Sequence, residues 1–178
     1  MKYYYIHGFN ATGKTTADKL TKLLDTKVEV LSWDYHKTFD ENIKNILKVL
    51  NVQTDKDIIL MGSSMGGFYA NFLANKLRVP CALFNPVINP QQVFKKLNCA
   101  ELSDEIIKSY TVQTDSVVPR LVVVGLNDNI LEPDKTIEYW RGKCNLKITE
   151  DSHQIENFNS FKDDILHLSI PLLCDGIV

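Results

Sequence analysis

Short apolar runs recur along the chain, and segments with helical periodicity separate them. A bounded run of this kind, rich in β-branched or aromatic residues, predicts a buried strand. The runs cover Tyr3–Ile6, Val28–Leu31, Asp57–Met61, Cys81–Phe84, Leu121–Val124 and, more weakly, Leu146–Ile148. Helical patterns lie between them at Thr16–Leu24, Phe39–Leu50, Gly67–Leu77 and Asp134–Trp140. The alternation predicts an α/β protein.

The strands themselves predict how the layers are arranged. A run such as Leu121–Val124 is apolar at every position, which is typical of a parallel strand covered on both faces, so we expect three layers with a mainly parallel sheet. The alternation is interrupted at residues 87–118, where a helix pattern starting at Pro90 is followed by another at Glu101–Tyr110. This segment is expected to form a small helical cap. No repeat or linker divides the sequence, and we expect residues 1–178 to form a single domain.

Composition excludes several classes of protein. Apolar residues make up 44% of the 178 residues, charged residues make up 24%, and the formal net charge is −2. Basic residues are scattered among acidic ones, so the chain has no basic stripe that could follow a phosphate backbone. We therefore expect a small-molecule partner rather than nucleic acid, while the oligomeric state cannot be deduced from the sequence.

Cysteine spacing and the amino terminus bear on the cellular compartment. The four cysteines are far apart in the sequence and form none of the close pairs of metal or redox sites. The apolar run near the amino terminus stops at His7, which is too short for a signal peptide, and no stretch reaches transmembrane length. Together these features predict a cytoplasmic protein without a membrane segment.

The most informative motif follows the third apolar run. Gly62 and Gly66 lie two positions either side of Ser64, and a helical pattern comes next. A serine on a sharp strand-to-helix turn needs small residues at those two positions, which is the pattern of a nucleophile elbow. Centring the motif on Ser63 would instead place Met61 and Met65 there. Ser64 is therefore the candidate nucleophile, although a glycine-rich turn without chemistry would match the same short pattern.

An acid and a histidine follow later strands in the order that an α/β hydrolase requires. Asp128 comes just after Leu121–Val124, and His153 comes just after the last predicted strand. The carboxyl ends of parallel strands meet at one edge of the sheet, where functional side chains gather. The order serine, acid, histidine then predicts a triad in which the acid orients the histidine and the histidine activates the serine.

Other residues compete for two of these roles. Glu132 and Asp134 are alternatives to Asp128, but they flank Pro133 at a predicted helix start, where a first-turn acid has a sufficient structural role. His7, His36 and His167 are alternatives to His153, but none of them follows the last strand. We therefore favour Asp128 and His153.

Acyl transfer at a serine also needs donors for the oxyanion. One is expected to be the backbone N–H that follows the nucleophile, which belongs to Met65. The other should come from the loop after an early strand, and Phe9 is the candidate. In this interpretation Gly8 allows the bend that directs the Phe9 N–H inward, and His7 supports the loop.

The same loop matches a competing motif. Gly8–Thr15 fits the phosphate-binding pattern G-x-x-x-x-G-K-[ST] between a strand and a helix, so a nucleotide-binding kinase that uses Lys14 is the alternative function. Two observations count against a kinase. Asp34 is the only candidate magnesium ligand, and the sequence has only three arginines with which to bind phosphate groups. A hydrolase-like binding protein with an idle triad is a further alternative. A triad hydrolase accounts for more of the motifs.

The combined motifs resemble the small YqiA-like esterases of the α/β-hydrolase superfamily over nearly the whole chain. The shared segments are Tyr5–Asn10, Gly62–Ala70 and Phe84–Pro86, together with the acid and histidine loops. The resemblance implies an intracellular serine esterase with Ser64, Asp128 and His153 as its triad and with no metal or organic cofactor. The sequence differs from what is usual in this family at Asn89, at Asp151–Ser152 and at Lys14–Thr15. Its expected reaction is hydrolysis of a carboxylic ester or thioester.

Overall fold

A single six-stranded sheet forms the centre of the computed structural model, which describes residues 1–50, 57–97, 99, 101–111 and 117–168. Every neighbouring pair of strands is parallel, and their order is β2-β1-β3-β4-β5-β6. The strands are β1 (Lys2–Ile6), β2 (Val28–Leu31), β3 (Ile58–Ser63), β4 (Cys81–Phe84), β5 (Arg120–Gly125) and β6 (Asn145–Thr149). The predicted strands are confirmed to within two residues at each end.

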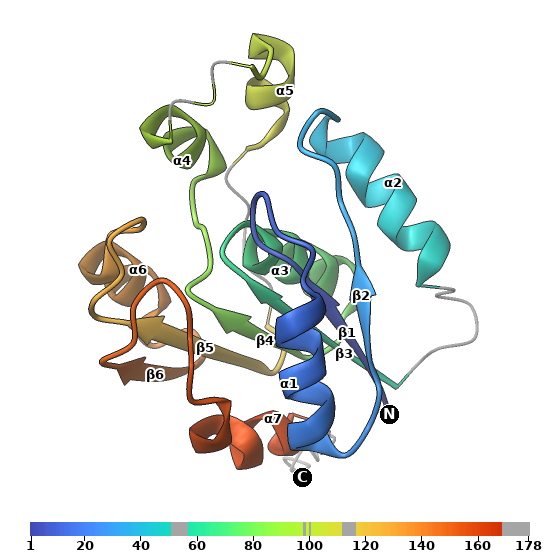
Figure 1. The fold of residues 1–178 in the computed structure, drawn as a ribbon, viewed down its shortest axis with the longest axis vertical. Helices are drawn as coiled ribbons and strands as arrows, with labels where there is room; N and C mark the ends of the chain where they lie inside the picture. Colours follow the sequence, from blue (N-terminus) through green and yellow to red (C-terminus); the bar gives the residue numbers. More distant parts are fainter. Residues whose placement is uncertain (51–56, 98, 100, 112–116, 169–178) are drawn as a thin grey trace, which may run out of the picture.

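Helices connect the strands, as parallel pairing requires. They are α1 (Lys14–Leu24), α2 (Phe39–Val49), α3 (Met65–Leu77), α4 (Pro90–Lys96), α5 (Asp104–Ser109), α6 (Pro133–Trp140), the 3₁₀ helix η1 (Phe158–Phe161) and α7 (Lys162–His167). Figure 1 shows their arrangement around the sheet. The start of α2 is fixed by a capping box between Thr38 and Glu41, and Pro90 occupies the first turn of α4.

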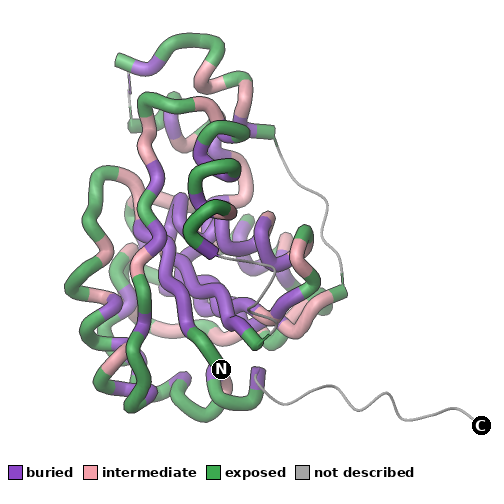
Figure 2. The backbone as a smooth tube through the Cα atoms, turned by 90° about the vertical axis from the view of Figure 1, so that its right-hand side faces the viewer, coloured by how far each residue is buried: buried purple, intermediate pink, exposed green. Residues whose placement is uncertain are grey.

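The sheet separates two hydrophobic cores, and the alternation of side chains along β1 shows why. Tyr4 and Ile6 pack into one core with residues of α2, α3 and α6, whereas Tyr3 and Tyr5 pack into the other with residues of α1, η1 and α7. Successive side chains of a strand point to opposite faces, so an apolar residue at every position fills both cores. In Figure 2 the strands are accordingly buried along the centre of the molecule. The predicted three-layer α/β fold with a parallel sheet is confirmed.

The segment that interrupts the alternation forms two short helices. α4 and α5 lie together at the top of Figure 1, and both begin at a side-chain cap, from Asn89 and Ser103 respectively. α4 lies close enough to the carboxyl ends of the strands for Val93 and Leu97 to share a pocket with Ser64. The segment therefore covers part of the site, while its status as a cap of a single domain stays a prediction.

Candidate active site

Ser64 occupies a strained turn between β3 and α3. Its backbone angles are φ 54° and ψ −122°, outside the regions that residues with a side chain normally adopt. Strain of this kind costs about 1–3 kcal/mol and persists only where surrounding structure enforces it. Here the Ser64 N–H donates to the carbonyl of Phe84 at 3.0 Å, and the Ser64 carbonyl accepts from Val87 at 3.1 Å. The end of β4 thus holds the turn in place.

The two flanking glycines are required by close backbone approach. A Cβ at Gly62 would collide with the carbonyl group of Gly66, and a Cβ at Gly66 would collide with the carbonyl oxygen of Ile6. Neither backbone group is free to move aside, because both belong to the centre of the fold. The prediction that the motif is centred on Ser64 rather than Ser63 therefore agrees with the geometry of a nucleophile elbow.

Asp128 is held in the turn after β5. Its Oδ1 accepts hydrogen bonds from the backbone N–H groups of Ile130 and Leu131, both at 2.8 Å, and its Oδ2 accepts from Nδ1 of His153 at 2.7 Å. The carboxylate is almost fully buried, with 2% of the side chain exposed. Both carboxylate oxygens of Asp128 therefore accept hydrogen bonds, Oδ1 from the backbone and Oδ2 from His153.

These contacts decide the charge of Asp128. Burial raises the pKa of the carboxyl, but hydrogen bonds from His153 and from the two backbone amides outweigh it, so the pKa lies below its usual value. The group is consequently ionised at neutral pH. An ionised acceptor fixes the proton of His153 on Nδ1 and leaves Nε2 unprotonated toward the pocket.

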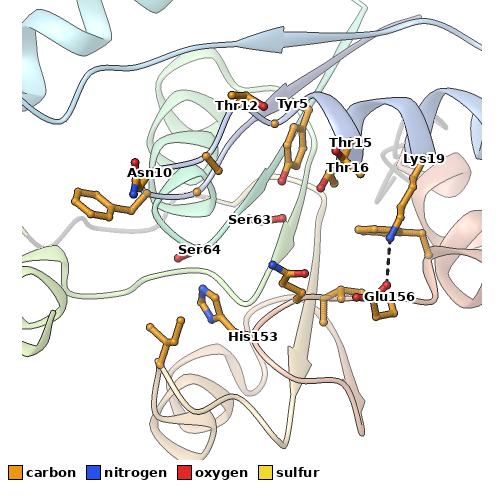
Figure 3. A pocket seen from close by; sticks show the side chains of 18 of the residues that line it. Tyr5, Asn10, Thr12, Thr15, Thr16, Lys19, Ser63, Ser64, His153 and Glu156 are labelled. Carbon is orange, nitrogen blue, oxygen red and sulfur yellow. Dashed lines mark hydrogen bonds and ion pairs between the residues drawn. The ribbon is translucent and has the colours of Figure 1, made fainter.

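His153 extends from the loop after β6 into a pocket of about 600 Å³ that Ser64 also lines. Figure 3 shows the imidazole ring and the Ser64 side chain facing each other across this pocket. The turn that carries Asp128 is tied to the end of β6, because Leu126 donates to the carbonyl of Thr149 at 2.8 Å and Asn127 to that of Asp151 at 3.1 Å. The structure thus brings together the three side chains that the sequence predicts.

Asn85 is a further site residue that the sequence analysis did not assign. It follows β4 with a positive φ of 43° and is 1% exposed. Its Nδ2 donates to the carbonyls of Ser152 and His153 at 2.9 and 3.0 Å, and its Oδ1 accepts from the N–H of Gly125 at 2.8 Å. One side chain therefore links the ends of β4 and β5 to the histidine loop. The sequence signals were its position directly after a buried strand and its place in Phe84–Pro86, a segment shared with the YqiA-like esterases.

The two predicted oxyanion donors belong to residues close to the serine. Met65 is the first residue of α3, so its N–H has no partner within the helix. The loop after β1 passes over the serine, and a Cβ built on Gly8 would lie 3.4 Å from Cβ of Ser64. Phe9 comes next in this loop and also lines the pocket. Both amides are thus close to Ser64, and their role as donors stays a proposal.

His7 stabilises the loop after β1 through contacts with Trp33 and Gly8. Its ring stacks on Trp33 with centroids 5.9 Å apart, its carbonyl accepts from Nε1 of Trp33 at 2.8 Å, and its own Nδ1 donates to the carbonyl of Gly8. Burial lowers the pKa of His7, opposed in part by the hydrogen bond to Gly8, so the ring is neutral at physiological pH. His7 does not line the pocket. The contacts agree with the supporting role predicted for it.

The remaining candidates lie outside the pocket. Lys14 is exposed at the start of α1 and is not a lining residue, and Asp34 contacts the backbone of His36 and the side chain of Lys37. Glu132 is exposed and pairs with Lys135 at 2.9 Å, as expected of an acid at a helix start. His36 is exposed, and His167 ends α7.

In the part of the chain that the structure describes, no three His, Cys, Asp or Glu side chains are grouped so that they could hold a metal ion. Within the same residues, no helix combines the length and the apolar character needed to cross a membrane.

Known structures define the class of protein. Est1E from Butyrivibrio proteoclasticus superposes with a TM-score of 0.72 at 17% identity, covering 94% of this chain and 88% of Est1E. The Pyrococcus furiosus esterase Pf2001 superposes with a TM-score of 0.66 at 15% identity, covering 94% of this chain and 79% of that one. At such identities the likeness is one of fold. The fold is that of the α/β hydrolases.

Sequence comparison then gives the family. The chain belongs to the Uncharacterised protein family UPF0227, whose family model matches residues 2–170. A UPF0227 protein of Vibrio vulnificus (strain CMCP6) is 19% identical across 90% of this chain and 98% of its own length. Another, from Shewanella woodyi, is 22% identical across 72% of this chain and 76% of its own. The resemblance to YqiA-like α/β hydrolases is thereby confirmed.

Proposed function

We propose that this protein is a serine hydrolase that cleaves a carboxylic ester or thioester through an acyl-Ser64 intermediate. The observation that carries the proposal is the 2.7 Å hydrogen bond from His153 to the buried, ionised Asp128, with the ring facing a serine in a strained elbow. A serine on a strained turn and a base oriented by a carboxylate are two of the features that acyl transfer at serine needs. The fold of esterases such as Est1E and Pf2001 supports it.

In the proposed reaction Nε2 of His153 takes the proton of the Ser64 hydroxyl while Oγ attacks the acyl carbon. The N–H groups of Phe9 and Met65 then stabilise the oxyanion. When the carbon–oxygen or carbon–sulfur bond breaks, His153 gives the proton to the departing alcohol or thiol. Water deprotonated by His153 next attacks the acyl group, which releases the acid and restores Ser64. Removing one oxyanion donor typically costs about 3–4 kcal/mol of barrier.

The chain needs no further group for these steps, since its own side chains supply the nucleophile, the base and the acid. We propose a small-molecule substrate and a cytoplasmic location. Among the described residues, Cys81, Cys99 and Cys144 are not joined in disulfide bonds, and two of them are buried, which supports a reducing compartment.

The proposal is tested with p-nitrophenyl acetate, whose hydrolysis releases a coloured product. Wild-type protein should hydrolyse it, and Ser64→Ala should lower kcat by about a thousandfold or more while the fold is retained. Circular dichroism and thermal unfolding check the fold. Wild-type protein without hydrolysis of this ester would favour the hydrolase-like binding protein with an idle triad.

A further inference from the structure

The pocket at Ser64 has two chemically different ends. Near the serine it is lined by apolar side chains of Phe9 and of α4, together with Ile130. Away from the serine it extends between the start of α1 and the loop after His153, where most lining side chains are polar and only Ile155 and Phe158 are apolar; the polar ones are Tyr5, Thr15, Thr16, Lys19, Ser63, Gln154 and Glu156. Figure 3 shows this second end, with labelled residues of α1 on one side and Glu156 on the other. We call it the polar end.

The proposed chemistry assigns each end to one part of the substrate. His153 must deliver a proton to the departing oxygen, so the leaving group has to lie against His153 and the residues that follow it. Gln154 and Glu156 belong to that segment and line the polar end. The departing alcohol or thiol therefore occupies the polar end, and the acyl group occupies the apolar end.

Hydroxyl groups cover the floor of the polar end. Burial raises the pKa of the Tyr5 hydroxyl, and the nearby side chains of Ser63 and Thr16 oppose this shift; all three residues line the pocket. Tyr5 itself is 3% exposed. Hydroxyls donate and accept at once, so a cluster of them can exchange hydrogen bonds with hydroxyls of a ligand without an excess of either role.

Charge at the polar end is balanced. Lys19 and Glu156 lie on opposite sides and form an ion pair at 3.1 Å, and the other residues lining this end are neutral. An anionic leaving group would have to compete with Glu156 for Lys19, and a cationic one would have to compete with Lys19 for Glu156. A neutral polar group meets neither obstacle and can contact both side chains.

From this arrangement we infer, as an extension of the proposed function, that the leaving group is a neutral alcohol with several hydroxyls, a sugar or another polyol. The enzyme then removes an acyl group from a hydroxylated carrier. Sites that hydrogen bond substrate hydroxyls discriminate strongly against analogues that lack them, since their polar groups would otherwise stay unpaired. Because this pocket is open to solvent, we expect discrimination of about tenfold or more, well below the ~10⁴- to 10⁵-fold that buried hydrogen-bonding sites reach.

The test compares three acetyl donors, so that the acyl end is constant. Methyl 6-O-acetyl-glucopyranoside carries a neutral polyol, butyl acetate an apolar alcohol, and acetyl-coenzyme A an anionic thiol. We expect kcat/KM for the sugar ester to exceed the other two by about tenfold or more. Equal or higher kcat/KM for either competitor overturns the inference, and so does hydrolysis of p-nitrophenyl acetate without hydrolysis of the sugar ester.

A matched pair of variants locates the effect. Thr16→Val removes one hydroxyl from the floor at nearly constant volume, whereas Thr26→Val makes the same change at an exposed position beyond α1. Thr16→Val should raise KM for the sugar ester about tenfold, with a smaller change for butyl acetate, and Thr26→Val should change neither. Equal changes in KM for both esters in Thr16→Val would overturn the inference. Failure of the proposed function is a separate result, since wild-type protein would then not hydrolyse p-nitrophenyl acetate at all.

Discussion

The side-chain nitrogen of Asn85 lies 3.0 Å from the carbonyl oxygen of His153, so a residue at the end of β4 holds the loop that carries the proposed base. The same side chain accepts from Gly125 at the end of β5, three residues before Asp128. The separation between acid and base is therefore set by a third residue that touches neither side chain. Asn85 acts as a positioning residue in this account.

We predict that Asn85→Ala lowers kcat about 10- to 100-fold with little change in KM. The variant leaves buried backbone groups unpaired, at about 1–3 kcal/mol each, and releases the histidine loop. Steady-state kinetics and thermal unfolding measure the two effects separately. Asn145→Ala is the control, because Asn145 is exposed and bonds only to Asp164 among the contacts of its side chain given by the structure. A loss of stability with unchanged kcat would show that Asn85 is merely structural.

The acid is tested by comparing two carboxylates four residues apart. Asp128→Asn should lower kcat by about a thousandfold or more, because an amide at Oδ2 favours the wrong tautomer of His153. Glu132→Gln should leave kcat unchanged, since the exposed Glu132 contacts Lys135 and only starts a helix. Turnover of p-nitrophenyl acetate measures both. An inactive Glu132→Gln beside an active Asp128→Asn would mean that the acid is misassigned.

His7 predicts a pH dependence of stability. Burial lowers the pKa of His7 in the folded protein below that of the unfolded chain, about 6.5. The unfolded chain then binds the proton more readily, so the free energy of unfolding falls as pH drops below about 6.5. Urea unfolding at pH 7.5 and at mildly acidic pH should show this loss in wild type and in His36→Gln, whose histidine is exposed. The same loss in His7→Gln would assign the effect to other groups.

Val93 is predicted to limit the length of the acyl group. Together with Ile130 it lines both the pocket at Ser64 and a neighbouring pocket of about 380 Å³. Val93→Ala should connect the two, and each methylene buried there contributes about 0.8 kcal/mol. We expect the ratio of kcat/KM for p-nitrophenyl octanoate to that for the acetate to rise several-fold. Lys95→Ala, on the same helix but outside both pockets, is the control. An unchanged ratio in Val93→Ala would contradict the assignment of the acyl end.

Much of the fold could be predicted because its strands are apolar at nearly every position. Leu121–Val124 is buried on both faces, and its composition alone indicates a central parallel strand. The turn at Ser64 could also be predicted from the sequence, because close backbone approach at Gly62 and Gly66 excludes larger side chains and so fixes both glycines. The regular alternation of one strand with one helix is interrupted between β4 and β5, where the chain forms two short helices. Helices this short have too few turns for a long hydrophobic periodicity.

The contacts between distant loops could not be predicted. Asn85 and His153 are 68 residues apart, and the hydrogen bond between them depends on how three strand ends meet. Likewise, Ser63 was considered only as a rival nucleophile, whereas its side chain belongs to the hydroxyl cluster around Tyr5. Such roles follow from tertiary geometry and leave no local pattern.

The central claim is that Ser64 is a nucleophile activated by His153 and Asp128. Its most direct test is reaction of the purified protein with a fluorophosphonate, followed by peptide mass spectrometry. The account predicts one adduct, on Ser64, which is absent in Ser64→Ala, still formed in Ser63→Ala, and formed far more slowly in His153→Ala. An adduct on Ser63, or no adduct on wild-type protein under conditions that label a known serine esterase, would contradict it.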